Sequence, residues 1–577
     1  MNGNHTRKIK RTLREVFGLE DLRPGQREVI ERVLDGEDVL AIMPTGAGKS
    51  LCYQLPALQK QGMTLVVSPL ISLMKDQSEK LEEKGLDVAN LNSSVPESEQ
   101  KESLEQVEQD KSDFIFTTPE RLTNAEFLKT LRDKEINFVV IDEAHCISQW
   151  GHDFRPAFLE LREAIRRLKN PPVLALTATA TPEVVEDIKK QLERPNMRVT
   201  NAGIFRPNLV FKVVHTTNDL EKRRRLSEIL SEIEGSKIVY CATVKAVEEV
   251  CEFLRSHGFE SVESYHGKLS AKVRNGVQDR FMAGETETII ATNAFGMGVD
   301  KPDIRAVAHW QIPGSLEAYY QEAGRAGRDG ETAQCVLLYD TRDRRTQQFF
   351  LGGRYPSADD IREIHTALEK TKAAETAVNF ERIKETAGDG VAKTKLRVGL
   401  NLLKDAGIVK EKRGAKFRLA KAGLSAEEIE KIAAEYVERG ETDREKLERM
   451  MLYAQSAFCR WRILSEYFGA ESNSAETEGC GSCDNCASPL AERLDIEVPP
   501  QQQPNGKAAM PDEEIPAKLK SETDGGSAEI EPGETVELPS YGKGQVKEIK
   551  EDKIVVAFPG GERKTFKKDF AAKIDKA

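Results

Sequence analysis

The chain has 577 residues, of which 39% are hydrophobic and 31% charged, and its formal net charge is −11. This length exceeds what one hydrophobic core supports, and no apolar run approaches the roughly 18 residues that cross a bilayer, so we expect several domains and no membrane span. An acidic total disfavours a protein that merely coats nucleic acid, because phosphate binding relies on Lys and Arg. The basic first residues lack the apolar stretch of a secretory signal, which predicts an intracellular protein.

Short apolar runs alternate with helical stretches over the first 345 residues. Five runs lie at 38–43, 64–68, 114–118, 138–142 and 173–177, and five more at 237–241, 261–266, 288–292, 306–310 and 335–339. Runs of this kind are typical of parallel sheets that are buried on both faces. The pattern predicts two tandem α/β domains, residues 1–205 and 206–345.

The second half of the chain changes character. Residues 346–440 are predicted to be mostly helical, with apolar residues at helical spacing in 393–409 before a basic ribbon that contains a turn. Such a pair resembles a winged helix, which places its helix in a groove and its wing against the backbone; a plain helical spacer is the alternative. Residues 491–530 have no aromatic side chain and predict a linker, and 531–577 regain β runs that predict a small all-β barrel.

The sequence PTGAGKS at 44–50 follows a predicted strand and opens a predicted helix. Backbone N–H groups of such a loop surround a phosphate, Lys49 reaches the terminal phosphates, and the Ser50 hydroxyl holds Mg²⁺. The usual pattern also has Gly at position 43, where this chain has Met43. The predicted phosphate-binding residues are Thr45, Gly46, Ala47, Gly48, Lys49 and Ser50.

Two adjacent carboxylates, Asp142 and Glu143, stand directly after the apolar run FVVI. At the end of a buried strand, Asp142 is positioned to hold Mg²⁺ through water, and Glu143 to polarise a water that attacks the γ-phosphate. A solvated turn, the structural alternative, does not account for a position directly after a buried run. With the glycine-containing loop, this pair predicts a nucleotide hydrolase.

QEAGRAGRDG at 321–330 places Arg325 and Arg328 three residues apart, on one face if the segment is helical. Guanidinium groups in this arrangement can cross a domain cleft and stabilise charge on a transferring phosphoryl group. The predicted catalytic residues are Lys49, Asp142, Glu143, Gln321, Arg325 and Arg328.

These motifs belong to a longer set, which includes FGLEDLRPGQREVI, VVSPLISLMKDQ, TTPERL, IDEAHCISQWGHDFRP, ALTATAT, YHGKLS and ATNAFGMGVDKPDIR. The chain resembles superfamily 2 helicases of the DExH type, and more narrowly the RecQ family. The resemblance implies RecA-like domains and an ATP- and Mg²⁺-dependent 3′ to 5′ DNA helicase of recombination, repair or replication restart. It also implies a cytoplasmic, nucleoid-associated bacterial protein, with DNA containing a single-stranded segment as partner. The sequence is silent on oligomeric state, and a monomer is favoured. An RNA helicase, a duplex translocase that does not unwind, and a recruitment factor with a vestigial ATPase are the alternatives.

The resemblance assigns further roles. Arg23 and Gln26 lie where the family reads the adenine, although Leu19 stands where the family often has a stacking aromatic residue. Residues 145–156 correspond to the aromatic-rich loop that senses single-stranded DNA, and bases stack on aromatic faces; core packing of Trp150 and Phe154 is the alternative. The DNA contacts that the resemblance implies are Ser68, Thr118, Gln149, Trp150, His152, Phe154, Arg155, Thr177, Thr179 and Thr292.

Cys480, Cys483 and Cys486 have the spacing C-x2-C-x2-C, and three thiolates leave a tetrahedral zinc one ligand short. Cys459 lies in a stretch that resembles the helix bearing the first zinc ligand in the RecQ family. We therefore predict a structural zinc module at 441–490; an iron–sulfur cluster is the alternative. The other five cysteines are predicted to be small core residues.

Two features depart from the RecQ pattern. In the family the zinc module follows the motor directly and a winged helix follows the zinc, whereas the wing-like piece near 391–420 precedes the zinc ligands here. The segment 531–577 resembles the Tudor or SH3-like barrel of UvrD/PcrA-type helicases and RNA polymerase binding modules. This implies recruitment to a protein partner such as RNA polymerase, or to nucleic acid through Lys564, Lys567 and Lys568; a mere stability appendage is the alternative.

Overall fold

The structure is a computed structural model that describes residues 3–93, 95–148, 150–151, 155–296, 299–388, 390–412, 416–421, 423–469 and 479–488, and five strands between 535 and 573. The chain divides into two compact units, Met1–Val498 and Pro499–Ala577. Across the described ranges, no helix is long and apolar enough to cross a membrane.

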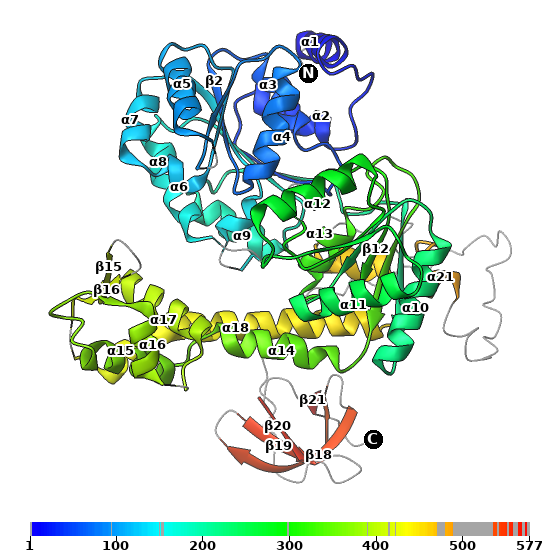
Figure 1. Cartoon of the computed structure of the whole chain (residues 1–577), viewed down its shortest axis with the longest axis vertical. Helices are drawn as coiled ribbons and strands as arrows, with labels where there is room; N and C mark the ends of the chain where they lie inside the picture. The colour runs from blue at the N-terminus through cyan, green and yellow to red at the C-terminus, as the bar shows by residue number, and fades with distance from the viewer. Residues whose placement is uncertain are drawn as a thin grey trace, which may run out of the picture. The chain divides into compact units, whose positions relative to one another are not determined.

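The first lobe is built on a seven-stranded parallel sheet (Figure 1). Across the sheet the strands are β3 (Val88–Leu91), β4 (Phe114–Thr117), β2 (Met63–Val67), β5 (Ile136–Ile141), β6 (Val173–Thr177), β1 (Val39–Ile42) and β7 (Arg198–Asn201). The helical elements are α1 (Gly3–Glu15), α2 (Gln26–Leu34), α3 (Leu51–Ala57), α4 (Ile71–Glu82), α5 (Glu97–Glu108), α6 (Pro119–Leu122), α7 (Ala125–Arg132), η1 (Ala144–Ile147), η2 (Pro156–Glu160), α8 (Leu161–Arg167) and α9 (Pro182–Gln191). Alternate residues of β1 enter two separate hydrophobic clusters, so both faces of the sheet are buried.

The second lobe has a six-stranded parallel sheet with a core on each face. Its strands are β10 (Val262–Tyr265), β11 (Thr288–Ala291), β9 (Ser236–Tyr240), β12 (Ile304–His309), β13 (Ala333–Tyr339) and β8 (Leu209–His215), and its helices are α10 (Asp219–Glu232), α11 (Val244–Ser256), α12 (Ala271–Ala283) and α13 (Leu316–Ala323). The predicted tandem α/β architecture is confirmed. All ten predicted apolar runs are strands, and three further strands, β3, β7 and β8, were not predicted.

A small helical unit with a three-stranded sheet follows. Its elements are α15 (Ala358–Lys370), β14 (Val378–Asn379), α16 (Phe380–Ala387), α17 (Lys393–Asp405), β15 (Val409–Lys412) and β16 (Lys416–Leu419). The sheet order is β14-β16-β15, and both pairings are antiparallel. The unit's own hydrophobic core and its antiparallel sheet exclude a plain helical spacer, and helices followed by the β15–β16 ribbon have the element order of a winged helix. It precedes the cysteine cluster in the chain, as the sequence predicts.

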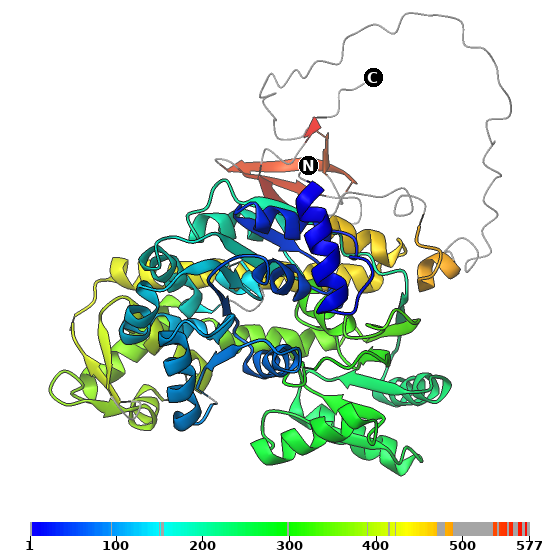
Figure 2. The same ribbon diagram turned by 90° about the horizontal axis from the view of Figure 1, so that it is seen from above.

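Two helices connect this winged helix to the second lobe: α14 (Asp343–Arg354) and the 30-residue α18 (Ala426–Gln455). Figures 1 and 2 both show the winged helix at one end of α18 and the cysteine-bearing region, with α19 (Arg460–Tyr467) and α21 (Asp484–Ala487), at the other. Leu447, Met450 and Tyr453 of α18 belong to the core of the second lobe, whereas Ile429 belongs to the core of the winged helix. One continuous helix therefore has its two ends in different cores.

The second unit contains a five-stranded antiparallel sheet. Its order is β20 (Arg563–Lys567), β19 (Lys553–Ala557), β18 (Gly542–Lys550), β17 (Thr535–Leu538) and β21 (Ala572–Lys573). Val546 and Val556 oppose one another in the ladder and are both fully buried. The predicted all-β unit is confirmed, and the predicted linker 491–530 lies outside the described residues.

Candidate ATP cleft and zinc centre

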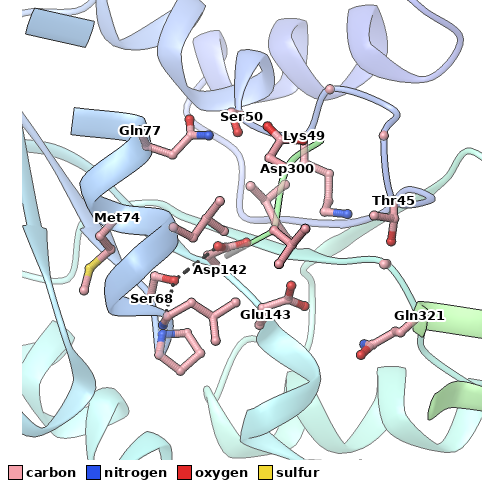
Figure 3. Close-up of a pocket in the computed structure, with 18 of the residues that line it drawn as sticks. Thr45, Lys49, Ser50, Ser68, Met74, Gln77, Asp142, Glu143, Asp300 and Gln321 are labelled. Carbon is pink, nitrogen blue, oxygen red and sulfur yellow. Dashed lines mark hydrogen bonds between the residues drawn. The ribbon is translucent and has the colours of Figure 1, made fainter. Parts of the chain in front are cut away.

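One cleft of about 390 Å³ is lined by residues from both lobes of the first unit. Lys49, Asp142 and Glu143 line it from the first lobe, and Arg325 and Arg328 from the second. Figure 3 shows Lys49, Glu143 and Gln321 around the same space. A cleft of this size suits a small-molecule ligand whose two ends contact different lobes.

The glycine-containing loop connects β1 to α3 and requires glycine at two positions. Gly46 and Gly48 have φ angles of +83° and +78°, a region that L-residues with side chains rarely adopt. A Cβ on Gly48 would lie 2.5 Å from Nε2 of Gln26, and one on Gly46 would lie 3.3 Å from Cγ of Arg328. The loop is thus closely packed by both lobes.

Gln26, predicted to contact adenine, is 2% exposed and braces this loop. Its Nε2 donates to the carbonyls of Ala47 (2.9 Å) and Gly48 (3.0 Å), and its Oε1 accepts from the backbone N–H of Arg23 (2.7 Å). The Arg23 guanidinium also donates to the carbonyl of Gly46. Both polar groups of the Gln26 amide are therefore used within the protein, and the adenine contact stays a prediction.

The charged groups at the centre of the cleft are buried. Burial lowers the pKa of Lys49, against the opposing charges of Glu143 and Asp142. Burial and the neighbouring Glu143 raise the pKa of Asp142 to about 7, while Ser68 donates a 3.2 Å hydrogen bond to its carboxylate. A buried carboxylate beside a second one is a site that a divalent cation stabilises, and the Ser50 hydroxyl lines the same cleft. These residues fit Mg²⁺.

A chain of polar side chains runs from Glu143 to the second lobe. Glu143 has a φ of +50°, a strained value for a residue with a side chain, and Oε2 is buried 3.3 Å from Nδ1 of His145. His145 Nδ1 lies 3.1 Å from Oγ1 of Thr177, which donates to the carbonyl of Thr179 (3.0 Å). Oγ1 of Thr179 then accepts from Nε2 of Gln321 (3.3 Å). The carboxylate of Glu143 therefore lies beside a hydrogen-bonded chain that reaches the other lobe.

The two predicted arginines lie in the cleft in different states. Arg328 forms an ion pair with Asp300, and Asp300 also lies 3.4 Å from Nζ of Lys80 on α4 of the first lobe. Burial lowers the pKa of Arg328, against the charge of Asp300. Nε of each arginine is buried without a hydrogen-bond partner among the described residues. The two differ in that Arg325, unlike Arg328, makes no ion pair among those residues.

Arg206, which the motifs did not indicate, joins the two lobes. It is 9% exposed and donates to the carbonyl of Thr45 in the phosphate loop (3.3 Å). It also donates to the carbonyls of Gly324 (2.8 Å), Ala326 (2.8 Å) and Gly327 (2.5 Å), between and beside the two arginines. One guanidinium therefore sets the position of the arginine-bearing loop relative to the phosphate loop. Nothing in the local sequence FRPNL signals this role.

The hydroxyl residues predicted to contact DNA are used inside the protein. Thr177 and Thr179 belong to the chain described above, and Ser68 is bonded to Asp142. Thr118 caps α6 by accepting from the N–H of Arg121, and Oγ1 of Thr292 accepts from the N–H of Ala294. All five side chains are buried in this structure, and their DNA contacts stay predictions.

The aromatic-rich loop is described only in part. Trp150 is half-buried against the core of the first lobe, and its carbonyl accepts a 2.6 Å hydrogen bond from Nζ of Lys446 on α18. Nζ of Lys446 also lies 3.7 Å from the carboxylate of Glu317 on α13. Arg155 donates to the carbonyl of Pro69 (3.3 Å). The predicted DNA contacts Gln149, His152 and Phe154 lie outside the described residues.

Four cysteine thiols form a compact cluster. The sulfur atoms of Cys459, Cys480, Cys483 and Cys486 all lie within 4.8 Å of one another. Four convergent thiolates match the closed tetrahedral coordination of structural zinc and leave no open position for catalysis. The residues fit the predicted metal, and the other five cysteines are buried, as expected.

The zinc cluster is tied to the edge of the second lobe. Asp484, between two of the ligands, accepts from the guanidinium of Arg460 (2.9 and 3.0 Å) and from the backbone N–H of Val213 on β8 (2.9 Å). Trp461 is fully buried and donates to the carbonyl of Leu209 on the same strand (3.3 Å). Hydrogen bonds therefore join the cysteine module to strand β8 of the second lobe.

Removal of zinc is expected to destabilise the second lobe as well as the cysteine module. Chelation should lower the midpoint of thermal unfolding by about 5–10 °C, since metal binding and folding are coupled. Differential scanning calorimetry of the full chain, before and after chelation and after zinc is restored, measures this shift. If chelation removes the zinc and the midpoint of thermal unfolding does not change, the zinc cluster does not stabilise the fold.

Sequence families and known proteins agree with this geometry. The DEAD/DEAH box helicase family matches residues 23–188, the helicase conserved C-terminal domain matches 221–330, and the RecQ zinc-binding family matches 425–487. Together with two lobes around one cleft, these family matches define a superfamily 2 helicase.

The similar curated proteins narrow this class. The chain is 36% identical over 486 residues to the probable ATP-dependent DNA helicase RecS of Bacillus subtilis (strain 168). The aligned region covers 84% of this chain and 93% of that protein. It is 46% identical over 342 residues to the ATP-dependent DNA helicase RecQ of the same organism, covering 59% of this chain and 57% of that one. With RecQ of Haemophilus influenzae the identity is 40% over 331 residues, 57% of this chain and 53% of that one. The chain belongs to the RecQ family of ATP-dependent DNA helicases, and it spans little more than half the length of these two RecQ proteins.

Proposed function

We propose that this protein is an ATP- and Mg²⁺-dependent helicase that moves 3′ to 5′ along one DNA strand and displaces its complement. The observation that carries the proposal is the single cleft lined by Lys49 on one lobe and by Arg325 and Arg328 on the other. A nucleoside triphosphate bound there contacts both lobes and draws them together. Hydrolysis removes the shared phosphate, so the lobes part, and alternating grip on the strand converts the cycle into steps.

The residues of the cleft divide the chemistry between them. Lys49 holds the terminal phosphates, and Ser50 and Asp142 hold Mg²⁺, which screens the phosphate charge. Glu143, whose buried Oε2 lies 3.3 Å from Nδ1 of His145 and makes no hydrogen bond among the described residues, orients the attacking water. Arg325 and Arg328 stabilise the charge that develops on the transferring phosphoryl group.

We propose that the chain from His145 through Thr177 and Thr179 to Gln321 couples these chemical steps to lobe movement. Its hydrogen bonds run from His145, whose Nδ1 lies 3.3 Å from the Glu143 carboxylate, to the helix that leads into the arginine loop of the other lobe. Separation of the lobes breaks the last link in this chain. The state of the nucleotide is thereby connected to the distance between the lobes.

The proposal keeps the predicted division of the chain: 1–205 and 206–345 as motor domains, 346–440 as the winged-helix region, 441–490 as the zinc module, 491–530 as the linker and 531–577 as the barrel. Single-stranded DNA contacts the aromatic-rich loop by base stacking. The bacterial relatives support action beside the nucleoid in the cytoplasm, in recombination, repair or replication restart. We further propose that the protein works as a monomer.

For the barrel we propose recruitment to a protein partner such as RNA polymerase. Its five antiparallel strands are the kind of small β module that presents a binding surface without an active site of its own. Recruitment through a separate unit leaves the motor free to act on DNA.

The proposed activity is tested by strand displacement on 3′-tailed, 5′-tailed and forked duplexes, with ATP hydrolysis measured in parallel on DNA and RNA. We expect displacement of the 3′-tailed and forked duplexes, and stronger stimulation of hydrolysis by single-stranded DNA than by RNA. If only the 5′-tailed duplex is displaced, the proposed 3′ to 5′ direction of movement is contradicted. Preferential stimulation by RNA would identify an RNA helicase.

A further inference from the structure

The helix α1 lies outside both the nucleotide cleft and the matching families. The DEAD/DEAH box match begins at residue 23, whereas α1 ends at Glu15, and none of its described residues lines the cleft. Figure 1 shows α1 at the outer end of the first lobe, on the side away from α18. The basic character of this helix is therefore not explained by ATP hydrolysis or by any DNA contact assigned so far.

The inner face of α1 is apolar and fixed. It packs against α2 and α3 in one hydrophobic cluster, whose buried members are Ile9, Leu13, Ile30, Leu51 and Leu55. Since α3 is the helix that follows the phosphate loop, α1 is held firmly on the first lobe. An amphipathic helix that binds a lipid surface buries its apolar face in the membrane. The apolar face of α1 is already occupied, which excludes that use.

The outer face of α1 carries five cations. Within the helix there are five Lys or Arg and one acidic residue, in a chain whose net charge is −11. All five cations are exposed: Arg7, Lys8, Lys10, Arg11 and Arg14. Arg7, Arg11 and Arg14 are four and three residues apart, so they follow one another along one line of the helix, opposite its apolar face. The helix therefore presents a row of positive charge to solvent.

This arrangement is unfavourable for the isolated protein. Arg7 with Arg11, and Lys10 with Arg14, are like-charge pairs at positions i and i+4, which destabilise a helix. The first turn has no acidic residue, although acidic side chains there would stabilise the positive end of the helix dipole. Among the described residues, the one ion pair of these five cations joins Arg11 to Glu15 (3.7 Å), and both groups are exposed. A bound polyanion would supply the missing counter-charge.

The chemistry of this face favours nucleic acid over an acidic protein segment. Protein interfaces are anchored by buried aromatic or aliphatic side chains. The exposed large hydrophobic side chains of the described residues include none on α1, and the nearest in sequence is Leu19. Nucleic acid needs no such anchor, since Lys and Arg alone supply non-specific affinity for phosphates.

The density of charge on α1 favours a duplex over a single strand. From Arg7 to Arg14 the helix advances by about 10 Å. Over this length duplex DNA carries about six phosphates, whereas one strand carries about three. Five cations are therefore matched more closely by the phosphates of a duplex.

We propose that the outer face of α1 is a second nucleic-acid site, which binds the phosphate backbone of duplex DNA without reading its sequence. The five cations contact phosphates of the duplex, while the single strand lies on the aromatic-rich loop. The site rests on the proposed helicase function. It adds a hold on duplex DNA that persists while the two lobes open and close, because α1 is packed within the first lobe alone.

The test uses the full zinc-loaded chain and a triple variant, Arg7→Gln, Lys10→Gln and Arg14→Gln, which retains Arg11 and Glu15. Gln preserves helix propensity. Fluorescence anisotropy measures the Kd for a blunt DNA duplex over a series of salt concentrations. We expect the Kd to rise at least about tenfold at low salt, and the slope of log K against log salt to fall by about 2.7, roughly 0.9 for each phosphate that the variant no longer neutralises. Since like-charge repulsion is relieved, the thermal midpoint of the variant should not fall.

A matched control removes the same charge elsewhere on the first lobe. Lys101, Lys111 and Lys129 are exposed, and their replacement by Gln should leave the duplex Kd unchanged. A variant of opposite sign is Glu15→Gln, which frees Arg11 and removes the one carboxylate of α1, so the duplex Kd should fall by about twofold. Equal losses in both triple variants, an unchanged Kd in the α1 triple variant, or a higher Kd in Glu15→Gln would overturn the site.

Other probes identify the class of partner. The ratio of the Kd of the α1 triple variant to that of the unmodified chain isolates the contribution of α1. This ratio should be larger for the duplex than for single-stranded DNA or for an oligo-glutamate of equal charge. The largest ratio for oligo-glutamate would identify an acidic protein segment as the partner. The largest ratio for single-stranded DNA would place α1 on the single-strand path, and either result would overturn the proposal.

ATP hydrolysis stimulated by single-stranded DNA distinguishes failure of this site from failure of the proposed helicase function. A chain without stimulated hydrolysis, whose duplex Kd still rises in the α1 triple variant, would retain this site and lose the motor. Conversely, normal stimulated hydrolysis together with an unchanged duplex Kd in that variant would retain the motor and lose the site.

Discussion

Replacement of Lys49 by Ala is expected to lower kcat for ATP hydrolysis by about 10²–10³-fold, the range for loss of one preorganised charge at a reacting centre. Lys49 lines the cleft and is buried beside Asp142 and Glu143. Arg23, the other Lys or Arg of the first lobe among the described lining residues, donates to the carbonyl of Gly46 instead. Phosphate release at saturating ATP and single-stranded DNA measures the change. Binding of single-stranded DNA should be largely retained, because the loop is separate from the aromatic-rich segment.

A second lysine of the same lobe provides the control for Lys49. Lys60 is partly buried, and its Nζ donates to the carbonyls of Val33 (3.1 Å) and Leu34 (3.2 Å) at the end of α2, outside the cleft. Lys60→Ala should lower thermal stability and leave kcat unchanged. Undiminished turnover in a folded Lys49→Ala variant would refute the assignment of the nucleotide site.

Arg206→Ala is expected to lower kcat by about 10²-fold, the effect of a small misplacement of catalytic groups. The variant loses every hydrogen bond between Arg206 and the loop that carries Arg325 and Arg328, and the bond to Thr45 as well. The arginines are then no longer fixed against the phosphate loop. Steady-state kinetics should show a larger effect on kcat than on KM for ATP, since Arg206 is not among the described residues that line the cleft.

Two variants separate this positioning role from a general loss of stability. Arg194 also joins distant segments, with bonds to Asp38 (3.0 Å) and Asn170 (2.6 Å), but only within the first lobe. Arg194→Ala should lower the thermal midpoint and keep kcat. Arg206→Lys should recover part of kcat, because an ammonium group reaches fewer of the carbonyls. If Arg206→Ala behaves like Arg194→Ala, the positioning role is contradicted.

The architecture followed from the sequence wherever a strand is buried on both faces, because such strands appear as continuous apolar runs. The three strands that were not predicted have another composition. β7 (RVTN) has one buried residue in four, and β8 (LVFKVVH) alternates between buried and more exposed positions at the edge of its sheet. Both β7 and β8 lie at sheet edges, where a polar face is allowed. Apolar runs therefore identified the central strands of each sheet and the edge strand β10, and missed the other edge strands β3, β7 and β8.

The candidate site was predictable where a motif is local in sequence. The phosphate loop, the Asp142–Glu143 pair and the two arginines each occupy a few consecutive residues, and the structure gathers them in one cleft. Contacts between distant segments could not be read in this way. Arg206 and Thr45 are 161 residues apart, and local spacing carries no signal for such a bond.

The predicted DNA residues show a second limit. Ser68, Thr177 and Thr179 were assigned by resemblance to the strand-binding surface, yet their hydroxyls bond to protein groups around the cleft. A hydroxyl serves a buried hydrogen bond as well as a phosphate contact, and residue type does not distinguish the two. Similarly, the side-chain amide of Gln26 donates hydrogen bonds to two carbonyls of the glycine-containing loop. The sequence motif does not indicate that these carbonyls are acceptors.

The 30-residue helix α18 gives the molecule a lever. At 1.5 Å per residue it is about 45 Å long, with one end set in the core of the second lobe and the other in that of the winged helix. If the second lobe turns by about 10° during a cycle, the far tip of such a rod sweeps about 8 Å, a little over two base-pair rises of 3.4 Å. A modest rotation at the cleft thus becomes a displacement on the scale of the base-pair ladder, delivered far from the bond that is cut.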